Sequence, residues 1–336
     1  MLLKSKLVIV SALFTLATNS MLSNAAEQTR WTFDGEIHNN SLALSPDEST
    51  AIVSISDQPK VIVYNLKELN KHITLESYIT PRNIIFSPSG NDFYVSDSSL
   101  GVVNKVDTQS LKTIAQMPLG AGAFGTTISQ DGKTLYVNNQ AASTVTAVDL
   151  DTNQPKAVIT GFAQPRQGVR LNPQNDKLFV TNFLGDKITI VNTATNKIES
   201  EIKGFNKLRA ISITQDGKTL FAANSGSNTI AVVDIDKRQI INTIKVGKDP
   251  YGAALTPDGK HVYSGNLGDN SLSEIDVSTM QVTATINGFK EPRQAIVFTH
   301  DGQYAYVLNV DLSISKLDLK SKKIVQTFNP SSQNLR

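Results

Sequence analysis

Short runs of alternating apolar and polar residues, separated by turn residues, recur along almost the whole chain. One set of four reads Ala210–Thr214, Thr219–Ala223, Thr229–Asp234 and Gln239–Ile244. Runs of this length that are rich in β-branched side chains and bounded by Gly, Asn and Asp are typical of β-strands. No sustained 3.6-residue periodicity follows the first 25 residues, so we expect almost no helix. The pattern predicts an all-β protein.

The set of four runs repeats seven times. Each copy contains a turn of the form Ser/Thr-X-Asp-Gly or a variant of it, and the third residue of this turn marks the copy. The seven marker residues are Asp47, Ser89, Asp131, Gln174, Asp216, Asp258 and Asp301. Successive markers are 42 or 43 residues apart. Asp-Gly supplies the positive φ that tight hairpins need, so the first two strands of each copy should pair.

Four strands in a repeat of this length are typical of a β-propeller blade. A lone four-stranded sheet leaves two apolar faces in water, whereas a ring of sheets buries them. An open β-solenoid is the rival, but its coils are usually shorter. We therefore expect one domain at 30–328, a seven-bladed β-propeller with four antiparallel strands per blade, and a polar tail at 329–336. The sequence leaves open whether Trp31–Phe33 closes the last blade, because Lys323–Phe328 also reads as its outermost strand.

The first 25 residues read as a signal peptide. Lys4 and Lys6 precede the apolar stretch Leu7–Ala17, and Ser23 and Ala25 place small residues before a cleavage site. The apolar stretch is too short to span a bilayer, which needs about 20 residues. We expect an exported protein without a membrane span. The periplasm is favoured, and the cell surface and the medium remain open.

Composition removes several kinds of chemistry. Cysteine is absent, which excludes disulfides, cysteine-ligated metals and a cysteine nucleophile. The 4 histidines have no metal-motif spacing, so no cofactor or metal is expected. Removal of the leader with its two lysines leaves 30 of the 32 basic side chains against 30 acidic ones. A neutral protein lacks the field of a general nucleic-acid binder, so any anion site must be a local cluster.

The second runs of the copies carry a recognisable motif. Leu135–Asn139, Leu178–Asn182 and Tyr306–Asn309 resemble the repeat of the YVTN family of β-propellers. The resemblance extends over all seven copies, although the first copy lacks the aromatic residue. It implies an exported or surface protein, mostly without known catalysis, with some relatives described as binding DNA. Similar propellers include sugar-lactone hydrolases and haem-bearing reductases, so the fold does not fix the function.

Aligned copies place equivalent residues in rings. The second run ends in Asn or Asp in every copy, at Asp57, Asp97, Asn139, Asn182, Asn224, Asn266 and Asn309. A position filled alike in all blades is expected to be structural, because Asn and Asp cap turns through bonds to the backbone. A ligand rarely contacts seven equivalent residues.

The loop that enters the innermost strand differs from blade to blade. About seven residues before the markers, it carries four arginines and two aromatic residues: Arg82, Phe124, Arg166, Arg209, Tyr251 and Arg293. In a propeller these side chains converge on a funnel at one end of the central channel. Guanidinium groups bind carboxylate or phosphate through paired donors, and aromatic faces stack on planar rings. Structural bonding of each Arg to a neighbouring blade is the competing interpretation.

These residues favour a non-enzymatic propeller that binds an anionic ligand in the funnel. Nucleic acid fits only through this local basic cluster. The alternative is a lactonase-like envelope hydrolase at the same funnel, with His38 and Glu291 as an acid–base pair beside Arg293. A third reading is an interaction scaffold for an envelope protein. We expect a monomer, because a closed ring buries its core without a partner. A haem reductase is the weakest reading, since no Cys is present and the histidines are scattered.

Overall fold

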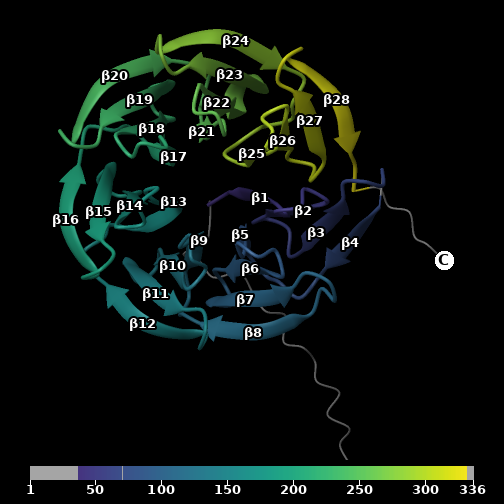
Figure 1. Cartoon of the computed structure of the whole chain (residues 1–336), viewed down its shortest axis with the longest axis vertical. Coiled ribbons are helices and arrows are strands. Elements are labelled where there is room, and N and C mark those ends of the chain that lie inside the picture. Colours follow the sequence, from purple (N-terminus) through teal and green to yellow (C-terminus); the bar gives the residue numbers. More distant parts are fainter. Residues whose placement is uncertain (1–36, 70, 331–336) are drawn as a thin grey trace, which may run out of the picture.

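The computed structural model describes residues 37–69 and 71–330. Within these residues, 28 strands form seven four-stranded antiparallel sheets, and each sheet uses four consecutive strands. Figure 1 shows the sheets as blades around a central channel, with the first strand of each blade innermost and the fourth on the rim. The predicted seven-bladed β-propeller is confirmed. The leader, Trp31–Phe33 and 331–336 lie outside the described residues.

Blades one to four are built from β1 (Asn40–Leu44), β2 (Thr50–Ile55), β3 (Val61–Asn65), β4 (His72–Leu75), β5 (Pro81–Phe86), β6 (Asp92–Asp97), β7 (Val102–Asp107), β8 (Thr113–Pro118), β9 (Ala123–Ile128), β10 (Thr134–Asn139), β11 (Thr144–Asp149), β12 (Gln154–Ile159), β13 (Pro165–Leu171), β14 (Lys177–Asn182), β15 (Lys187–Asn192) and β16 (Lys197–Ile202). Blades five to seven are built from β17 (Leu208–Ile213), β18 (Thr219–Asn224), β19 (Thr229–Asp234), β20 (Gln239–Lys245), β21 (Ala254–Leu255), β22 (His261–Asn266), β23 (Ser271–Asp276), β24 (Gln281–Asn287), β25 (Ile296–Phe298), β26 (Tyr304–Leu308), β27 (Ile314–Asp318) and β28 (Lys323–Phe328). The one helical element in this part of the chain is a 3-10 turn, η2 (Leu267–Asp269).

The marker turn folds alike in most blades because its side chains bond to its own backbone. In blade five the Thr214 hydroxyl donates to Asp216 Oδ1 at 2.6 Å, and the same oxygen accepts the Lys218 N–H at 3.0 Å. Gly217 follows with a φ of 71°, which glycine adopts without strain. These bonds explain why a hydroxyl residue, an Asp and a Gly recur at this spacing.

The apolar core lies between blades. Between blades four and five, Phe179 and Ile190 pack against Ile211 and Val233, and all four side chains are buried. Burial of one such side chain contributes about 1.5–3 kcal/mol. Six further clusters of the same kind occupy the other blade-to-blade contacts of the described ring.

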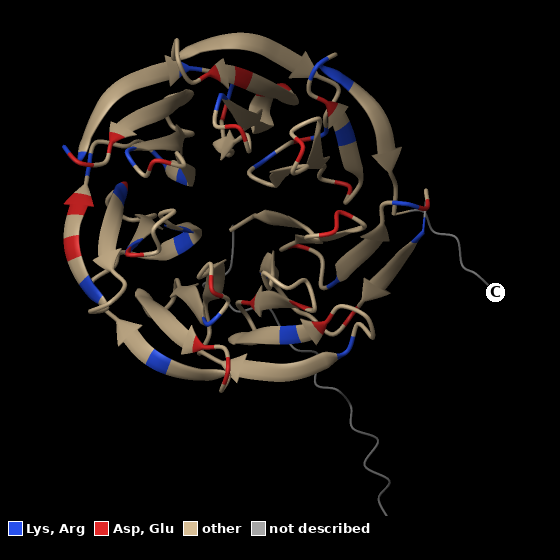
Figure 2. Ribbon diagram, in the orientation of Figure 1, with Lys and Arg blue, Asp and Glu red and all other residues tan. Residues whose placement is uncertain are grey.

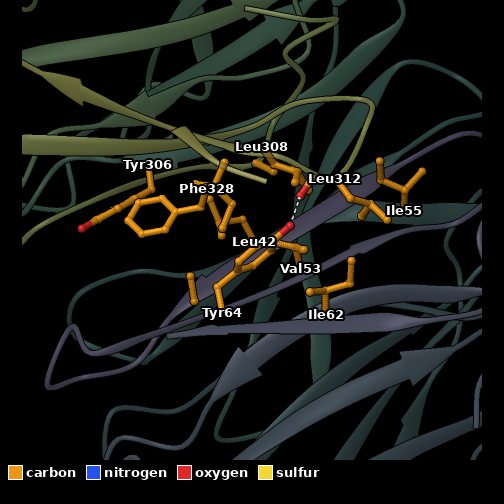
Figure 3. Packing of buried hydrophobic residues seen from close by; sticks show 12 residues of the cluster. Leu42, Val53, Ile55, Ile62, Tyr64, Tyr306, Leu308, Leu312 and Phe328 are labelled. Atoms are coloured by element: carbon orange, nitrogen blue, oxygen red, sulfur yellow. Dashed lines mark hydrogen bonds between the residues drawn. The ribbon is translucent and has the colours of Figure 1, made fainter. Parts of the chain in front are cut away.

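The ring closes by packing rather than by strand exchange in the described residues. Blade seven takes all four strands from the C-terminal end, so Lys323–Phe328 is its outermost strand. At the seam, Phe328 packs in one cluster with Tyr64 of blade one, whose hydroxyl donates to the Leu312 carbonyl at 2.8 Å (Figure 3). The described residues contain no fifth strand, which leaves Trp31–Phe33 untested.

The Asn/Asp ring at the ends of the second strands has a structural role. Asp97 is fully buried and accepts backbone N–H groups from Ile79, Thr80, Ser99 and Leu100. Burial raises the pKa of Asp97, and these four donors oppose that rise. Asn309 instead donates to Ser313 and Ser315.

Acidic and basic residues occur in every part of the ring. Figure 2 shows the two kinds of segment mixed around it. No helix in the described residues combines the length and the apolar character needed to cross a membrane.

Candidate functional site

A cavity of about 320 Å³ opens at the end of the channel where first strands begin and second strands end. Strand pairing brings these two points together, since Pro165 at the start of β13 faces Asn182 at the end of β14. We call this cavity the funnel. Five of the six predicted site residues line it, joined by Phe183 and His38: Phe124, Arg166, Phe183, Arg209, Tyr251, Arg293 and His38.

Guanidinium groups and aromatic rings alternate around the funnel wall. The Arg166 guanidinium carbon lies 3.2 Å from the centre of the Phe183 ring. Arg209 lies between two rings, 6.0 Å from Phe183 and 4.5 Å from Tyr251, and Arg293 lies 5.2 Å from Tyr251 on the other side. Each cation–π contact of this kind contributes about 0.5–1 kcal/mol where solvent reaches it. The rings therefore hold the three cations in place without neutralising them.

Glycines in the first and second strands of the blades allow the backbones that carry these side chains to approach closely. A Cβ at Gly125 would lie 2.5 Å from the carbonyl oxygens of both Arg166 and Gln167. A Cβ at Gly265 would lie 2.1 Å from the Arg293 carbonyl oxygen. Real Cβ atoms do not approach oxygens so closely, so only glycine fits at these two positions.

Polar side chains tie the same loops to the preceding blade. Ser96 on β6 donates its hydroxyl to the Phe124 carbonyl, and Asn138 on β10 donates to the Arg166 carbonyl at 2.6 Å. Both residues sit one position before the Asn/Asp ring. The sequence pattern places the funnel residues on loops, but Phe124, Arg166 and Arg209 are the second residues of β9, β13 and β17, so rigid strands position them directly.

The funnel is positively charged without a compensating acid. None of its lining residues is Asp or Glu, and among the described residues no ion pair joins Arg166, Arg209 or Arg293 to a carboxylate. Burial, with repulsion from Arg209 and Arg82, lowers the pKa of Arg166 to about 10. The buried Nε of Arg166 also has no hydrogen-bond partner in this part of the chain.

Arg82, the remaining predicted residue, lies behind the wall and is fully buried. Its guanidinium donates to Ser98 Oγ at 2.8 Å, to the Ile37 carbonyl at 2.7 Å and to Asn39 Oδ1 at 2.8 Å. It also stacks 4.6 Å from the Phe124 ring. The structure therefore supports the competing interpretation for Arg82, in which the arginine bonds to protein groups and has a structural role.

The two residues of the hydrolase alternative are placed differently from each other. His38 lines the funnel, and its Nδ1 lies 2.6 Å from Asp57 Oδ2. Arg293 donates to the His38 carbonyl at 3.1 Å. Glu291 is exposed, does not line the funnel, and its N–H bonds to Asn270 Oδ1. The carboxylate next to His38 is therefore Asp57.

Phe183 is the funnel residue that sequence reasoning missed. It directly follows Asn182 in the second-strand ring, where blades two and five have Ser98 and Ser225. Those serines accept from the arginine of the same blade, at 2.8 Å from Arg82 and 3.0 Å from Arg209. The sequence signal for Phe183 was an aromatic residue at a position that holds serine in blades two and five.

No three His, Asp or Glu side chains within the described ranges are close enough to hold a metal ion together. The funnel offers a ligand guanidinium donors, aromatic rings and one imidazole, together with the amide and hydroxyl groups of Asn39, Gln167, Thr181 and Gln294.

Comparisons with known proteins agree with this architecture. No curated protein sequence matches the chain. Hydrazine synthase of Kuenenia stuttgartiensis superposes with a TM-score of 0.75 at 18% identity, over 83% of this chain and 94% of that one. A functionally unknown protein from Desulfotomaculum acetoxidans gives 0.65 at 20% identity, over 70% and 79%. Both likenesses concern the fold. The family described as Lactonase, 7-bladed beta-propeller matches residues 17–197 and 193–297, and the chain belongs to this family.

Proposed function

We propose that the protein is a binding propeller whose funnel takes up a small organic anion with a planar ring. The observation that carries the proposal is the convergence of Arg166, Arg209 and Arg293 on one cavity that no Asp or Glu lines. Unpaired guanidinium groups are costly to hold together, and a bound carboxylate or phosphate removes that cost through charge-assisted bonds.

The shape of the funnel supports a small ligand over a polymer. Its volume of about 320 Å³ falls in the range of small-molecule sites. Phe183 and Tyr251 are half-buried in the funnel wall, where their rings offer a planar ligand aromatic contacts and the neighbouring guanidinium groups suit its anionic substituent. A single nucleotide end or an acidic side chain of an envelope protein would present the same chemistry, and these belong to the outcomes of the test.

Calorimetry with phenyl phosphate, phthalate and a short oligonucleotide tests the proposal. We expect one of the two small anions to bind, with an affinity that falls as salt rises. Arg209→Gln should weaken binding by about 10- to 100-fold, because a charge-assisted bond contributes about 1.5–3 kcal/mol. Arg238→Gln makes the same change on an exposed outer turn and should have no effect. Unchanged binding in folded Arg209→Gln, or binding of the oligonucleotide alone, overturns the small-anion assignment.

Hydrolysis of a lactone is the second candidate function. It is favoured by the His38–Asp57 pair at the funnel and by the name of the family. In this reading the His38 imidazole removes a proton from water while the water oxygen adds to the lactone carbonyl. The ring C–O bond then breaks, and the alkoxide receives the proton. Asp57 holds the imidazole in position, and an arginine stabilises the oxyanion.

A panel of lactones and esters separates the two functions. Activity that is lost in His38→Gln and reduced in Asp57→Asn supports hydrolysis. If the purified protein hydrolyses no compound of the panel but binds the anion, only the binding function remains supported.

We further propose export to the bacterial envelope, in keeping with the leader-like residues 1–25 and the YVTN-like second strands. Mass spectrometry of the chain recovered from a periplasmic fraction should show a new N-terminus after Ala25. Recovery of uncleaved chain from the cytoplasm contradicts this.

A further inference from the structure

A second and larger cavity, of about 960 Å³, opens at the opposite end of the channel, beside the marker turns. We call it the lower cavity. Gln167, Gly168, Ala210 and Gln294 line both cavities and form a neck between them.

Hydrogen bonds cross the channel at the neck. Gln167 of blade four accepts from Asn39 at 2.7 Å, at the entry to blade one, and donates to Asn83 of blade two at 2.9 Å. These bonds join opposite sides of the ring. The lower cavity is therefore a separate site from the funnel.

The walls of the lower cavity combine polar side chains, among them Asn83, Gln215 and Thr256, with a belt of apolar ones. The residue three positions before each marker is hydrophobic in all seven blades and lines the cavity. These residues are Leu44, Phe86, Ile128, Leu171, Ile213, Leu255 and Phe298. All but Phe86 are only partly buried, and most pack against the cores between blades. They form a ring, which we call the apolar ring, whose inner faces remain open to the cavity.

One charged side chain interrupts this surface. Arg170 on β13 lies one position before the apolar ring, where the other blades have Ala43, Ile85, Thr127, Ser212, Ala254 and Val297. Its side chain is exposed to the cavity, and its one hydrogen bond among the described residues runs from a guanidinium nitrogen to the adjacent Val169 carbonyl at 2.9 Å. No residue that lines the cavity is Asp or Glu.

Two further observations distinguish Arg170 from a structural arginine. Arg82 is a structural arginine, because it is fully buried and donates hydrogen bonds to three other residues. Arg170 has neither feature, and surrounding protein lowers its pKa with no acid to offset the effect. In the neighbouring strand β17, the buried Ser212 Oγ also lacks a partner among the described residues. His300, the other basic group in the lining, lies at the exposed rim and is paired with Glu48 at 2.8 Å.

We infer that the lower cavity binds an aliphatic carboxylate. The carboxylate accepts paired N–H bonds from the Arg170 fork, and the alkyl chain lies on the apolar ring. A guanidinium fork matches a carboxylate, and the apolar ring offers the alkyl chain a surface on which it leaves water.

Titration of the full chain with decanoate, octanoate and decanol tests this site. Decanoate should bind more tightly than octanoate by about three- to fourfold per methylene, and decanol should bind at least tenfold more weakly than decanoate. Arg170→Gln should weaken decanoate about tenfold or more, and Arg170→Lys should retain part of the affinity. Arg238→Gln serves as the matched control on the outer surface.

Methyl NMR locates the bound probe. Decanoate should shift the methyl signals of Leu171 and Leu255 in the lower cavity, and leave those of Leu208 and Leu267 in the funnel in place. The inference is overturned if decanoate does not bind, if folded Arg170→Gln binds it equally well, or if the funnel methyls alone respond.

Discussion

The two ends of the central channel are built from the same repeat but offer different chemistry. At the funnel, three arginines and three aromatic rings come from the first residues of innermost strands, from the loops before them and from the residue after a second strand. At the lower cavity, one arginine lies beside a ring of apolar strand residues, in a wall that also carries Ser, Thr, Asn and Gln side chains. Blade packing constrains the strand faces, because the apolar ring also completes the cores between blades. The arginines and aromatic residues of the funnel are not part of these cores, so they can differ from blade to blade.

The largest effect on stability is expected from a methyl group added beside the neck residue Gln167, between the funnel and the lower cavity. Gly125→Ala places a Cβ 2.5 Å from two carbonyl oxygens of β13, so the strand that carries Arg166 and Arg170 must shift. We expect a loss of about 3 kcal/mol in the free energy of unfolding, measured with denaturant, since overpacking against backbone is poorly relieved. Ligand binding should weaken at both ends.

Gly259→Asn is the control for that substitution. A Cβ at Gly259 meets nothing within 4 Å, and Asn tolerates its φ of 70°. A loss under about 1 kcal/mol is expected here. Equal losses in the two variants would show that the close approach at Gly125 is unimportant.

The sequence predicts the ring of blades almost completely because the fold is repeated seven times. The four runs of the fifth copy correspond to β17–β20 with shifts of at most two residues at either end. Local bonds such as those of Asp216 lie within four residues of one another, so they are visible as a motif. The sequence left the closure of the ring open because Trp31–Phe33 and Lys323–Phe328 both fitted the outermost strand of the last blade. The cluster that contains Phe328 and Tyr64 joins blades seven and one, which lie at opposite ends of the sequence.

The funnel was less completely predictable. Position in the repeat correctly places Arg166, Arg209 and Arg293 around one cavity, because equivalent residues share radius and height. It does not show that Arg82 turns away toward Ile37 and Asn39, since those partners precede the first blade. Nor does it identify Arg170 as a candidate binding residue. That inference depends on strands distant in sequence, which contribute no Asp or Glu to the lining of the lower cavity.

A smaller effect with the opposite sign is expected at the funnel. Arg166→Gln removes a buried cation that Arg209 repels and whose Nε is unpartnered, at the cost of its contact with Phe183. Solvent in the cavity screens much of the repulsion, so we expect a gain of about 0.5–1 kcal/mol in the unliganded protein. Anion binding should fall at the same time. Denaturant unfolding with and without phenyl phosphate measures both, and a less stable variant would show that Arg166 is structural.

Replacement of Tyr251 tests whether aromatic stacking contributes to binding at the funnel. Tyr251→Leu removes the ring between Arg209 and Arg293, whereas Tyr251→Phe keeps it. We expect the Leu variant to bind phenyl phosphate about three- to fivefold more weakly, corresponding to 0.5–1 kcal/mol, and the Phe variant to match the parent. Equal affinity in both variants would remove the aromatic rings from the site.

The smallest effect is expected from lowering the pH, which should destabilise the marker turns and leave the arginines of the funnel unchanged. Hydrogen bonds from the Ser45 and Ser49 hydroxyls, followed by the Ser49 N–H, lower the pKa of Asp47 to about 2. Its ordinary value in an unfolded chain is about 3.9, so the carboxylate stabilises the fold above pH 4 and loses this contribution as the pH falls toward 2. Asp47→Asn should therefore lower the thermal midpoint by about 1 °C at pH 7, and the difference should vanish near pH 2. A difference that stays constant over this range would mean that the Asp47 charge is not what stabilises the turn.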